Sequence, residues 1–422
     1  MKFIHAADLH IDSPLRGLDA YPGAPVERLR GASRQALVAL VDLAIEEQVA
    51  FVLLAGDIYD GNWVDFRTGL FFRDQMVRMT REGIHVFIVK GNHDAESQIS
   101  KQLPDVDGVH VFSSHKSETV HLEDHGVAVH GRSFPNRAVP EDLVPNYPDP
   151  VPGLFNIGIL HTSLTGRVGH DPYAPTSVEV LCDKGYDYFA LGHVHAREVV
   201  RDSTPRIVFP GNLQGRHAKE TGPKGCELVT VEGGVITATE FVELDVVRWH
   251  QMQLDVSGLS SLDMLAKHFI TEALALAEHA HDRLHAVRVL IHGESPLHRV
   301  EAEQPGTLTA AIQAATQELV DCELWLEQVL LDMRSPFDRQ SAAGRDDAIG
   351  EVVRLVNGLG NDELSLKVWF SQQLSEMKDL PAALADASPE NLGGTAMRAY
   401  LADAEATILA QMSELSRDGA QR

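Results

Sequence analysis

Apolar and polar positions follow two different rhythms in the first part of the chain. Short apolar runs predict buried strands, and stretches with apolar residues every three or four positions predict amphipathic helices. The expected strands are residues 3–6, 51–55 and 85–89, and the expected helices are residues 28–47 and 66–82. This alternation is typical of an α/β fold built on a β-α-β-α-β unit.

A second group of short apolar runs follows, with turn residues between the runs. They cover residues 109–112, 119–122, 127–130, 156–160, 188–191, 207–209 and 228–231. Their close spacing predicts a second, hairpin-rich sheet. We therefore expect residues 1–245 to form one domain, a two-sheet β-sandwich flanked by helices.

The pattern changes near Val246 to strand, helix, strand, helix and strand. These elements are expected at residues 249–256, 261–278, 286–292, 308–318 and 324–332. Residues 246–334 are therefore expected to form a small α+β domain, within the usual size range of a domain.

Residues 335–422 are expected to be a linker followed by a helical C-terminal region. Asp346 is the expected N-cap of a helix that ends at Gly358. The last helix has one apolar stripe, made of Met397, Leu401, Ala404, Ile408, Met412 and Leu415. Such a stripe packs on neighbouring helices or on a partner protein, and the sequence leaves both open.

Composition places the chain among soluble globular proteins of more than one domain. It has 422 residues, of which 44% are hydrophobic and 23% charged, and single cores stop growing at roughly 250 to 300 residues. No apolar run approaches the roughly 20 residues that span a bilayer, and the first residues lack a signal-peptide pattern. The cysteines Cys182, Cys226 and Cys322 are far apart, which predicts reduced thiols and a cytoplasmic protein.

The formal net charge of -25 argues against a protein that coats nucleic acid non-specifically. Phosphate binding depends mostly on Lys and Arg, which displace counterions. Acidic residues are denser after Asp245, so we expect any contact with nucleic acid in the first part of the chain. Bound cations would assist it.

Five short polar motifs each follow an expected strand. They are Asp8-Leu9-His10, Gly56-Asp57, Gly91-Asn92-His93-Asp94, His161 and Gly192-His193-Val194-His195. Each motif alone is compatible with an ordinary turn or a packed residue, but residues beyond strand ends converge in α/β folds. Carboxylate, imidazole and amide donors without thiolate suit Mn²⁺, Fe²⁺ or Zn²⁺ better than Mg²⁺.

The ordered set therefore predicts a centre of two divalent metal ions. Asp57 is the natural bridge, because two cations about 3.5 to 4 Å apart repel each other and a shared anion offsets the repulsion. His93 adjoins Asn92 and is the candidate acid that protonates a leaving alkoxide.

The motifs resemble those of the calcineurin-like metallophosphoesterase superfamily and, more closely, its SbcD-type DNA repair nucleases of the bacterial YhaO-like branch. The resemblance rests on residues 3–10, 56–60 and 209–217 and covers the whole first domain. The α+β domain stands where these nucleases carry a capping domain. The resemblance implies that Asp8, His10, Asp57 and His195 bind the first metal ion and Asp57, Asn92, His161 and His193 the second.

The same resemblance implies Mn²⁺ as the usual metal and His93 as the catalytic histidine. It implies a DNA nuclease or exonuclease that hydrolyses phosphodiester bonds in DNA repair. An SbcC-like coiled-coil ATPase, docked on the C-terminal helices, and a homodimer are the implied partners. Some members have a histidine in place of Asp60, linked there to exonuclease action, so the balance of exonuclease and endonuclease action stays open.

Two alternatives remain. One is a phosphatase or cyclic-nucleotide phosphodiesterase with the same dinuclear site, and the other is a non-catalytic DNA-binding subunit. Among the remaining polar residues, His5 is expected to be packed in the core. Four others are candidates for contact with substrate phosphate or metal: His170, Asp171, Arg216 and His217.

Overall fold

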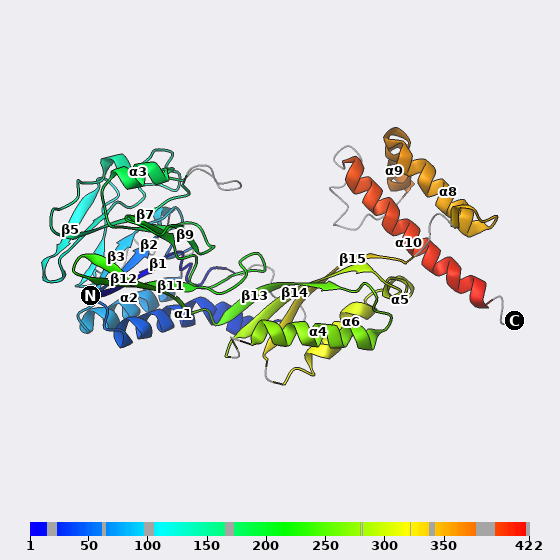
Figure 1. Ribbon diagram of the computed structural model, residues 1–422, viewed down its shortest axis with the longest axis horizontal. Coiled ribbons are helices and arrows are strands. Elements are labelled where there is room, and N and C mark those ends of the chain that lie inside the picture. Colours follow the sequence, from blue (N-terminus) through cyan, green and yellow to red (C-terminus); the bar gives the residue numbers. More distant parts are fainter. Residues whose placement is uncertain are drawn as a thin grey trace. The chain divides into compact units, whose positions relative to one another are not determined.

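The computed structural model describes residues 1–14, 23–60, 65–96, 105–164, 173–278, 280, 282–320, 322–336, 342–376 and 393–418 (Figure 1). The chain divides into two compact units. The first is Met1–Gln251, His279–Arg288 and Asp321–Glu327, and the second is Met252–Glu278, Val289–Val320 and Gln328–Arg422. None of the helices among the described residues is long and apolar enough to cross a membrane.

The first sheet of the first unit has six strands in the order β12-β11-β1-β2-β3-β4. They are β1 (Lys2–Ala6), β2 (Phe51–Ala55), β3 (His85–Val89), β4 (Val109–Val111), β11 (Gly225–Glu232) and β12 (Val235–Glu243). Strands β1 to β4 are parallel, because α1 (Val26–Glu46) and α2 (Phe66–Arg81) return the chain between the first three. Both helices bury apolar side chains in a shared core with this sheet, among them Leu40 and Met76 against Val52.

The second sheet also has six strands, in the order β5-β6-β7-β8-β10-β9. They are β5 (Glu118–Leu122), β6 (Val127–Gly131), β7 (Phe155–His161), β8 (Tyr188–Gly192), β9 (Glu198–Arg201) and β10 (Arg206–Phe209). The two sheets share a buried core that contains Phe3, Phe51, Ile157 and Tyr188. A short helix, α3 (Val178–Asp183), contributes Leu181 to a further core around Phe189. The two-sheet sandwich with outer helices is thus confirmed.

Two details of the expected sandwich were wrong. Residues 109–112 and 228–231 supply strands β4 and β11 of the first sheet, not the second. The second sheet is not hairpin-rich, because β6, β7, β8 and β10 are parallel neighbours and only the edge strands β5 and β9 pair antiparallel. Short apolar runs indicate strands, but their spacing does not determine which neighbour each strand pairs with.

The expected elements after residue 246 are present. Strands β13 (Val247–Asp255), β14 (Leu284–Glu294) and β15 (Leu324–Arg334) form a three-stranded sheet, and the helices are α4 (Leu262–Ala277), α5 (Leu297–Glu303) and α6 (Thr307–Thr316). Helix α5 and the edge strands β9 and β12 were not expected from the sequence. Short 3₁₀ turns in the first unit lie at Asp94–Glu96, Glu123–His125 and Val144–Asn146.

The C-terminal region is helical, but two expectations about it were wrong. Its helices are α8 (Ala348–Asn361), α9 (Glu363–Glu376) and α10 (Gly394–Asp418). Asp347, not Asp346, caps α8, since its carboxylate accepts from the Gly350 backbone N–H at 3.0 Å. Gly358 lies inside this helix and does not end it.

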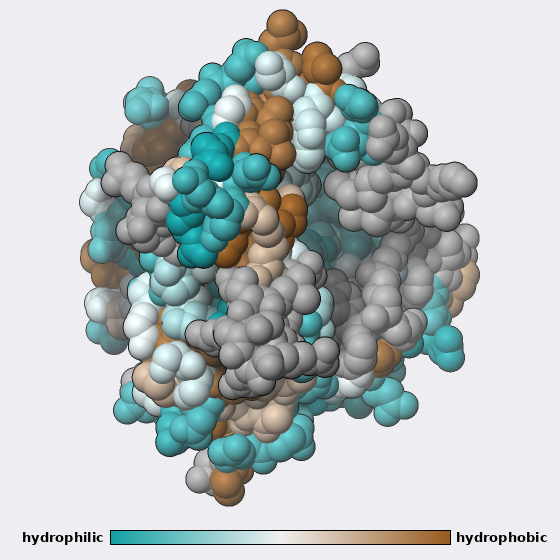
Figure 2. All heavy atoms as spheres, turned by 90° about the vertical axis from the view of Figure 1, so that its right-hand side faces the viewer, coloured by the Kyte–Doolittle hydropathy of each residue, from teal (hydrophilic) through white to brown (hydrophobic). Residues whose placement is uncertain are grey.

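The apolar stripe of α10 is not one buried face. Met397 and Leu401 pack with Leu366 of α9, whereas Leu409 packs with residues of α8. Ala404 and Ile408 are exposed. Figure 2 shows brown apolar atoms reaching the molecular surface on the side that it views, among hydrophilic ones.

Candidate metal centre

The polar motifs lie at or just beyond the carboxyl ends of parallel strands. Asp8 and His10 follow β1, Asp57 follows β2, and Asn92 and His93 follow β3. In the second sheet His161 ends β7, and His193 and His195 follow β8. Contacts between the sheets bring these ends together, because the Asp8 carboxylate accepts from the His193 backbone N–H at 3.0 and 3.1 Å.

The sheets approach so closely at this edge that only glycine fits at two positions. A Cβ atom on Gly192 would lie 1.9 Å from the carbonyl oxygen of Ala55. A Cβ atom on Gly56 would lie 2.4 Å from Nδ1 of His161, and Gly56 also has a positive φ of 93°. These glycines therefore allow the two groups of strand ends to meet.

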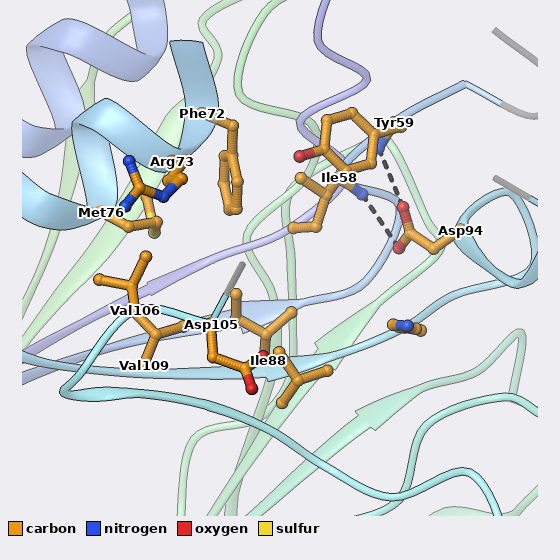
Figure 3. Close-up of a pocket in the computed structure, with 12 residues that line it drawn as sticks. Ile58, Tyr59, Phe72, Arg73, Met76, Ile88, Asp94, Asp105, Val106 and Val109 are labelled. Carbon is orange, nitrogen blue, oxygen red and sulfur yellow. Dashed lines mark hydrogen bonds between the residues drawn. The ribbon is translucent and has the colours of Figure 1, made fainter. Parts of the chain in front are cut away.

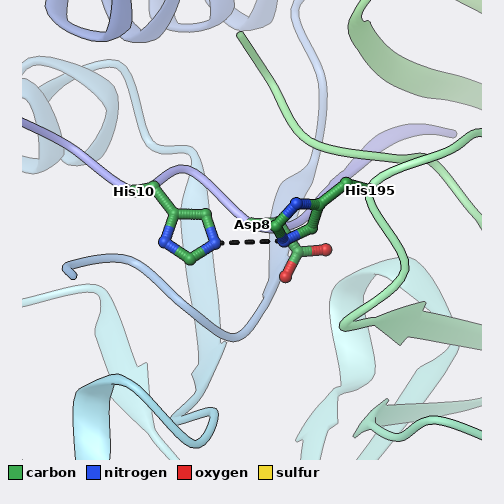
Figure 4. A group of neighbouring side chains, drawn as sticks. All are labelled: Asp8, His10 and His195. Carbon is green, nitrogen blue, oxygen red and sulfur yellow. Dashed lines mark hydrogen bonds between the residues drawn. The ribbon is translucent and has the colours of Figure 1, made fainter. Parts of the chain in front are cut away.

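Asp8, His10 and His195 form the first cluster of ligand atoms (Figure 4). Nε2 of His10 lies 3.2 Å from Nε2 of His195. Two nitrogen ligands about 2.1 Å from one metal ion would be about 3.0 to 3.4 Å apart. Nδ1 of His195 lies 2.7 Å from Oε1 of Glu220 and 3.2 Å from Nη2 of Arg216, so Nε2 is the ring nitrogen that faces the cluster.

Asp57, His161 and Asn92 form the second cluster, to which Asp8 also contributes. Nδ1 of His161 donates to the Ala55 carbonyl at 2.9 Å, which leaves the lone pair of the neutral ring at Nε2. This nitrogen is 2.9 Å from Oδ1 of Asn92 and 3.5 Å from Oδ2 of Asp57. Three acceptors that face one another fit a shared cation.

Asp57 lies between the two clusters. Its Oδ2 atom is 3.5 Å from Nε2 of His161 and 3.9 Å from Nε2 of His10. Its Oδ1 atom accepts from the His93 backbone N–H at 3.0 Å, which fixes the carboxylate in place. This position is compatible with the expected bridge between two metal ions.

Burial controls the protonation of the ligand groups. It raises the pKa of Asp57 to about 6, and burial, with the nearby Asp57 charge, raises the pKa of Asp8 well above its ordinary value. Burial also lowers the pKa of His161 to about 3 and that of His10 well below its usual range. His10 and His161 are therefore neutral and able to bind metal, and the two carboxylates would gain from a nearby cation. This donor set fits divalent metal ions.

His93 is held by an acidic partner at the margin of the clusters. Its Nδ1 atom lies 2.9 Å from Oδ1 of Asp60, whose Oδ2 accepts from the Ser13 hydroxyl at 2.6 Å. The hydrogen bond to Asp60 is the main cause that raises the pKa of His93. The ring is 5.2 Å from that of His10 and partly exposed, so a protonated His93 can reach a substrate.

Two further carboxylates stabilise the centre and were not singled out in the sequence. Asp94 accepts from the backbone N–H groups of Ile58, Tyr59 and Gly91, and so ties the Asp57 loop to the Asn92 loop (Figure 3). Glu220 accepts from His195, from the Arg216 backbone N–H at 2.7 Å and from Nδ2 of Asn212 at 3.0 Å. Asp94 belongs to the third motif, but no spacing signal marks Glu220.

His193 is placed differently from the other expected ligands. It reaches Asp8 through its backbone, and its ring centroid is 5.2 Å from that of His161. In the described part of the chain, no group of three mutually close carboxylate, thiolate or imidazole atoms includes it. Its expected role as a ligand of the second metal ion stays a prediction.

The remaining candidates divide into packed, adjacent and undescribed residues. His5 is buried, with Nδ1 3.0 Å from the Tyr188 hydroxyl and Nε2 3.1 Å from the Leu191 carbonyl, as expected of a core residue. Arg216 lies beside the centre, with Nη2 3.0 Å from Oε1 of Glu220. His217 is mostly exposed. His170 and Asp171 lie outside the described residues.

Two segments of the chain match known protein families. Residues 1–197 match the family described as calcineurin-like phosphoesterase, and residues 249–334 match the family described as metallophosphoesterase YhaO, middle domain. The uncharacterized metallophosphoesterase YhaO of Bacillus subtilis is 33% identical over 341 residues, which are 79% of this chain and 81% of that protein.

More distant likenesses are also present. The DNA double-strand break repair protein Mre11 of Sulfurisphaera tokodaii is 24% identical over 232 residues, which are 52% of this chain and 59% of that protein. The Mre11 protein of Thermoplasma acidophilum is 24% identical over 278 residues, or 62% and 70% of the two chains. A solved dimetal phosphatase from Danio rerio has 15% identity and a TM-score of 0.36, covering 58% of this chain and 97% of that one.

Proposed function

The chain belongs to the YhaO-like family of calcineurin-like metallophosphoesterases, and from this premise we propose that it is a dinuclear metal-dependent nuclease that hydrolyses phosphodiester bonds of DNA. The position of Asp57 between two clusters of imidazole nitrogens and carboxylate or amide oxygens carries the proposal. An arrangement of this kind suits two cations that share one carboxylate.

The chain's own residues would bind the metal ions in two sets. Asp8, His10, Asp57 and His195 would bind one ion, and Asp57, Asn92, His161 and His193 the other, with Mn²⁺ as the proposed metal. When bound, the two cations supply Lewis acidity at the phosphate and activate water for attack. Asp94 ties the loop of Asp57 to the loop of Asn92, and Glu220 orients the His195 ring so that Nε2 faces His10.

His93 is the proposed general acid. The Asp60 carboxylate beside Nδ1 raises the pKa of His93 and so favours the charged ring, which has a second proton at Nε2. As water attacks phosphorus and the bond to the leaving oxygen breaks, His93 gives the Nε2 proton to that oxygen. The neutral ring then takes a proton from solvent, to which it is partly exposed.

Two observations support DNA as the substrate: the names of distant relatives and the presence of further domains after the first. Two relatives are named as DNA double-strand break repair proteins. We assign residues 1–245 to the nuclease domain, residues 246–334 to a capping domain, and residues 335–422 to a region that docks a coiled-coil ATPase of the SbcC kind. Exposed apolar side chains on α9, Leu364 and Val368, support such docking.

The test compares DNA with small phosphate esters. Purified protein is incubated with end-labelled linear DNA, a chromogenic phosphodiester and a chromogenic phosphomonoester, with Mn²⁺ or with chelator. We expect the protein to cleave DNA when Mn²⁺ is present and to leave DNA intact when chelator is present. His93→Asn should lower kcat on DNA by about 10² to 10⁴-fold, the usual contribution of a positioned acid, and retain metal binding.

His110→Asn is the matched control, because His110 lies on β4 away from the centre and pairs with Glu118. Its rate should equal that of the wild type. If the protein hydrolysed the small esters and left DNA intact, its activity would be that of a phosphatase or phosphodiesterase and not that of a nuclease. Metal-loaded protein that hydrolyses none of the three substrates would overturn the enzyme itself and favour a binding subunit.

A further inference from the structure

Three arginines surround a hollow of 310 Å³ beside the candidate metal centre. It is lined by Asp12, Ser13, Pro14, Arg30, Arg34, Asp65 and Arg67. Arg30 and Arg34 lie one turn apart on α1, and Arg67 lies in the first turn of α2. Among the described residues, the lining has three cationic and two anionic side chains.

The two aspartates orient the guanidinium groups without using all their donors. Arg34 donates from Nε to Asp12 at 2.8 Å and from Nη2 at 2.5 Å, and its guanidinium lies 4.9 Å from the Phe71 ring centroid. Arg67 donates from Nε at 3.2 Å and from Nη2 at 3.1 Å to Asp65. In both pairs Nη1 takes no part in these bonds, so the pre-oriented cations retain N–H groups for an anion.

A chain of hydrogen bonds connects the hollow to His93, the proposed general acid. Ser13 lines the hollow, and its hydroxyl donates to Oδ2 of Asp60 at 2.6 Å. Oδ1 of the same carboxylate is 2.9 Å from Nδ1 of His93. Ser13 thus links the hollow directly to Asp60, the carboxylate that holds His93.

We propose that this hollow is an anion subsite that binds a backbone phosphate of a polynucleotide next to the phosphate being cleaved. Planar guanidinium groups match phosphate oxygens in pairs, and guanidinium is weakly hydrated and always charged. A substrate with one phosphate cannot fill the metal centre and the hollow together. The subsite therefore favours nucleic acid chains over small esters, an inference that rests on the proposed nuclease function.

Equilibrium binding tests the subsite separately from turnover. A labelled single-stranded oligonucleotide is titrated with Mn²⁺-loaded His93→Asn protein, with and without Arg67→Gln, at several salt concentrations. Arg67 is chosen because 86% of its side chain is exposed, so the substitution does not disturb a core. We expect about tenfold weaker binding, as for one charge-assisted hydrogen bond, and a slope of log Kd against log salt smaller by about 0.7.

Arg78→Gln is the matched control on the same helix. Arg78 is partly exposed and paired with Asp42 at 2.5 Å, but it does not line the hollow. It should leave both the affinity and the salt slope unchanged. Activity gives a second readout: in protein that retains His93, Arg67→Gln should lower the ratio of oligonucleotide to chromogenic diester turnover about tenfold.

The outcomes separate the subsite from the nuclease function. Tight oligonucleotide binding with the same affinity and slope in Arg67→Gln as in its parent would overturn the subsite and leave the nuclease proposal standing. An equal loss in Arg78→Gln would also overturn it, since charge anywhere on α2 would then suffice. Absence of oligonucleotide binding in both proteins, with turnover of the chromogenic diester retained in the wild type, would overturn both proposals.

Discussion

At the scale of single residues, the backbone of the centre is strained where the ligands lie. The φ angles of Asp8, His10, Asp57 and His193 are 52°, 43°, 52° and 106°. Residues other than glycine avoid these positive φ angles, because each such residue costs about 1 to 3 kcal/mol of backbone strain. These are residues whose side chains or N–H groups meet at the candidate centre.

Glu220→Gln tests whether the carboxylate beside His195 tunes a metal ligand. The amide has nearly the same shape but cannot hold the imidazole proton as strongly, so the lone pair at Nε2 becomes less available. We expect Mn²⁺ affinity to fall about 10 to 100-fold, as for partners of metal-binding histidines, with thermal stability little changed. Isothermal titration calorimetry measures this affinity.

Glu240→Gln serves as the control, because Glu240 is exposed on the edge strand β12. Its Mn²⁺ affinity should equal that of the wild type. Glu220→Asp should recover part of the loss, since it restores the charge on a shorter side chain. Equal affinity in Glu220→Gln and wild type would show that Glu220 has no part in metal binding.

The sequence predicted most residues of the centre, because each motif follows a strand and has metal-binding side chains. It did not indicate Glu220, a lone carboxylate in a loop with no pattern around it. Nor did it indicate that Asp60 would pair with His93, since that contact depends on how two loops fold over each other. Single residues without a repeated spacing become visible only in three dimensions.

At the scale of elements, the centre depends on the close packing of β8 against β2. Gly192 ends β8, and a Cβ atom there would overlap the Ala55 carbonyl. Gly192→Ala should therefore force the sheets apart and destabilise the protein by about 1 to 3 kcal/mol, as other overpacked cores do. Denaturant unfolding followed by circular dichroism measures the change.

Gly31→Ala is the matched control for the same substitution. Gly31 lies within α1, where a Cβ atom would meet only Nε2 of Gln35 at 3.8 Å. Alanine should stabilise this helix by about 0.5 to 1 kcal/mol. If Gly192→Ala unfolds at the wild-type denaturant concentration or above it, the close approach of the two sheets is not as described.

Helices and strands with a clear hydrophobic periodicity were predicted at the right positions. The neighbouring strands or helices that they pack against were not predicted. The first three strands and two helices match their expected positions within two residues. The sheet membership of β4 and β11 depends on contacts between distant segments, which local periodicity does not contain. In α10 the helix changes partner from α9 to α8 along its length, so its buried positions do not follow one stripe.

At the scale of the whole molecule, a strongly acidic chain is expected to bind a polyanion. Bound cations would reconcile these properties, because they would neutralise Asp8 and Asp57, whose burial disfavours their charged forms. The hollow lined by Arg34 and Arg67 would add guanidinium donors for phosphate beside the candidate centre. The net charge of -25 argues against broad coating of DNA, so the proposed contact with DNA would be local.

Metal content and spin coupling of Mn²⁺-loaded protein test whether Asp57 bridges two metal ions. Elemental analysis after desalting, with electron paramagnetic resonance, should give two Mn²⁺ per chain with an exchange-coupled spectrum. Asp57→Ala should lose the coupling and bind fewer than two ions, while Asp42→Ala, at an exposed site on α1, should match the wild type. One uncoupled ion in the wild type, or a coupled pair in Asp57→Ala, would contradict the account.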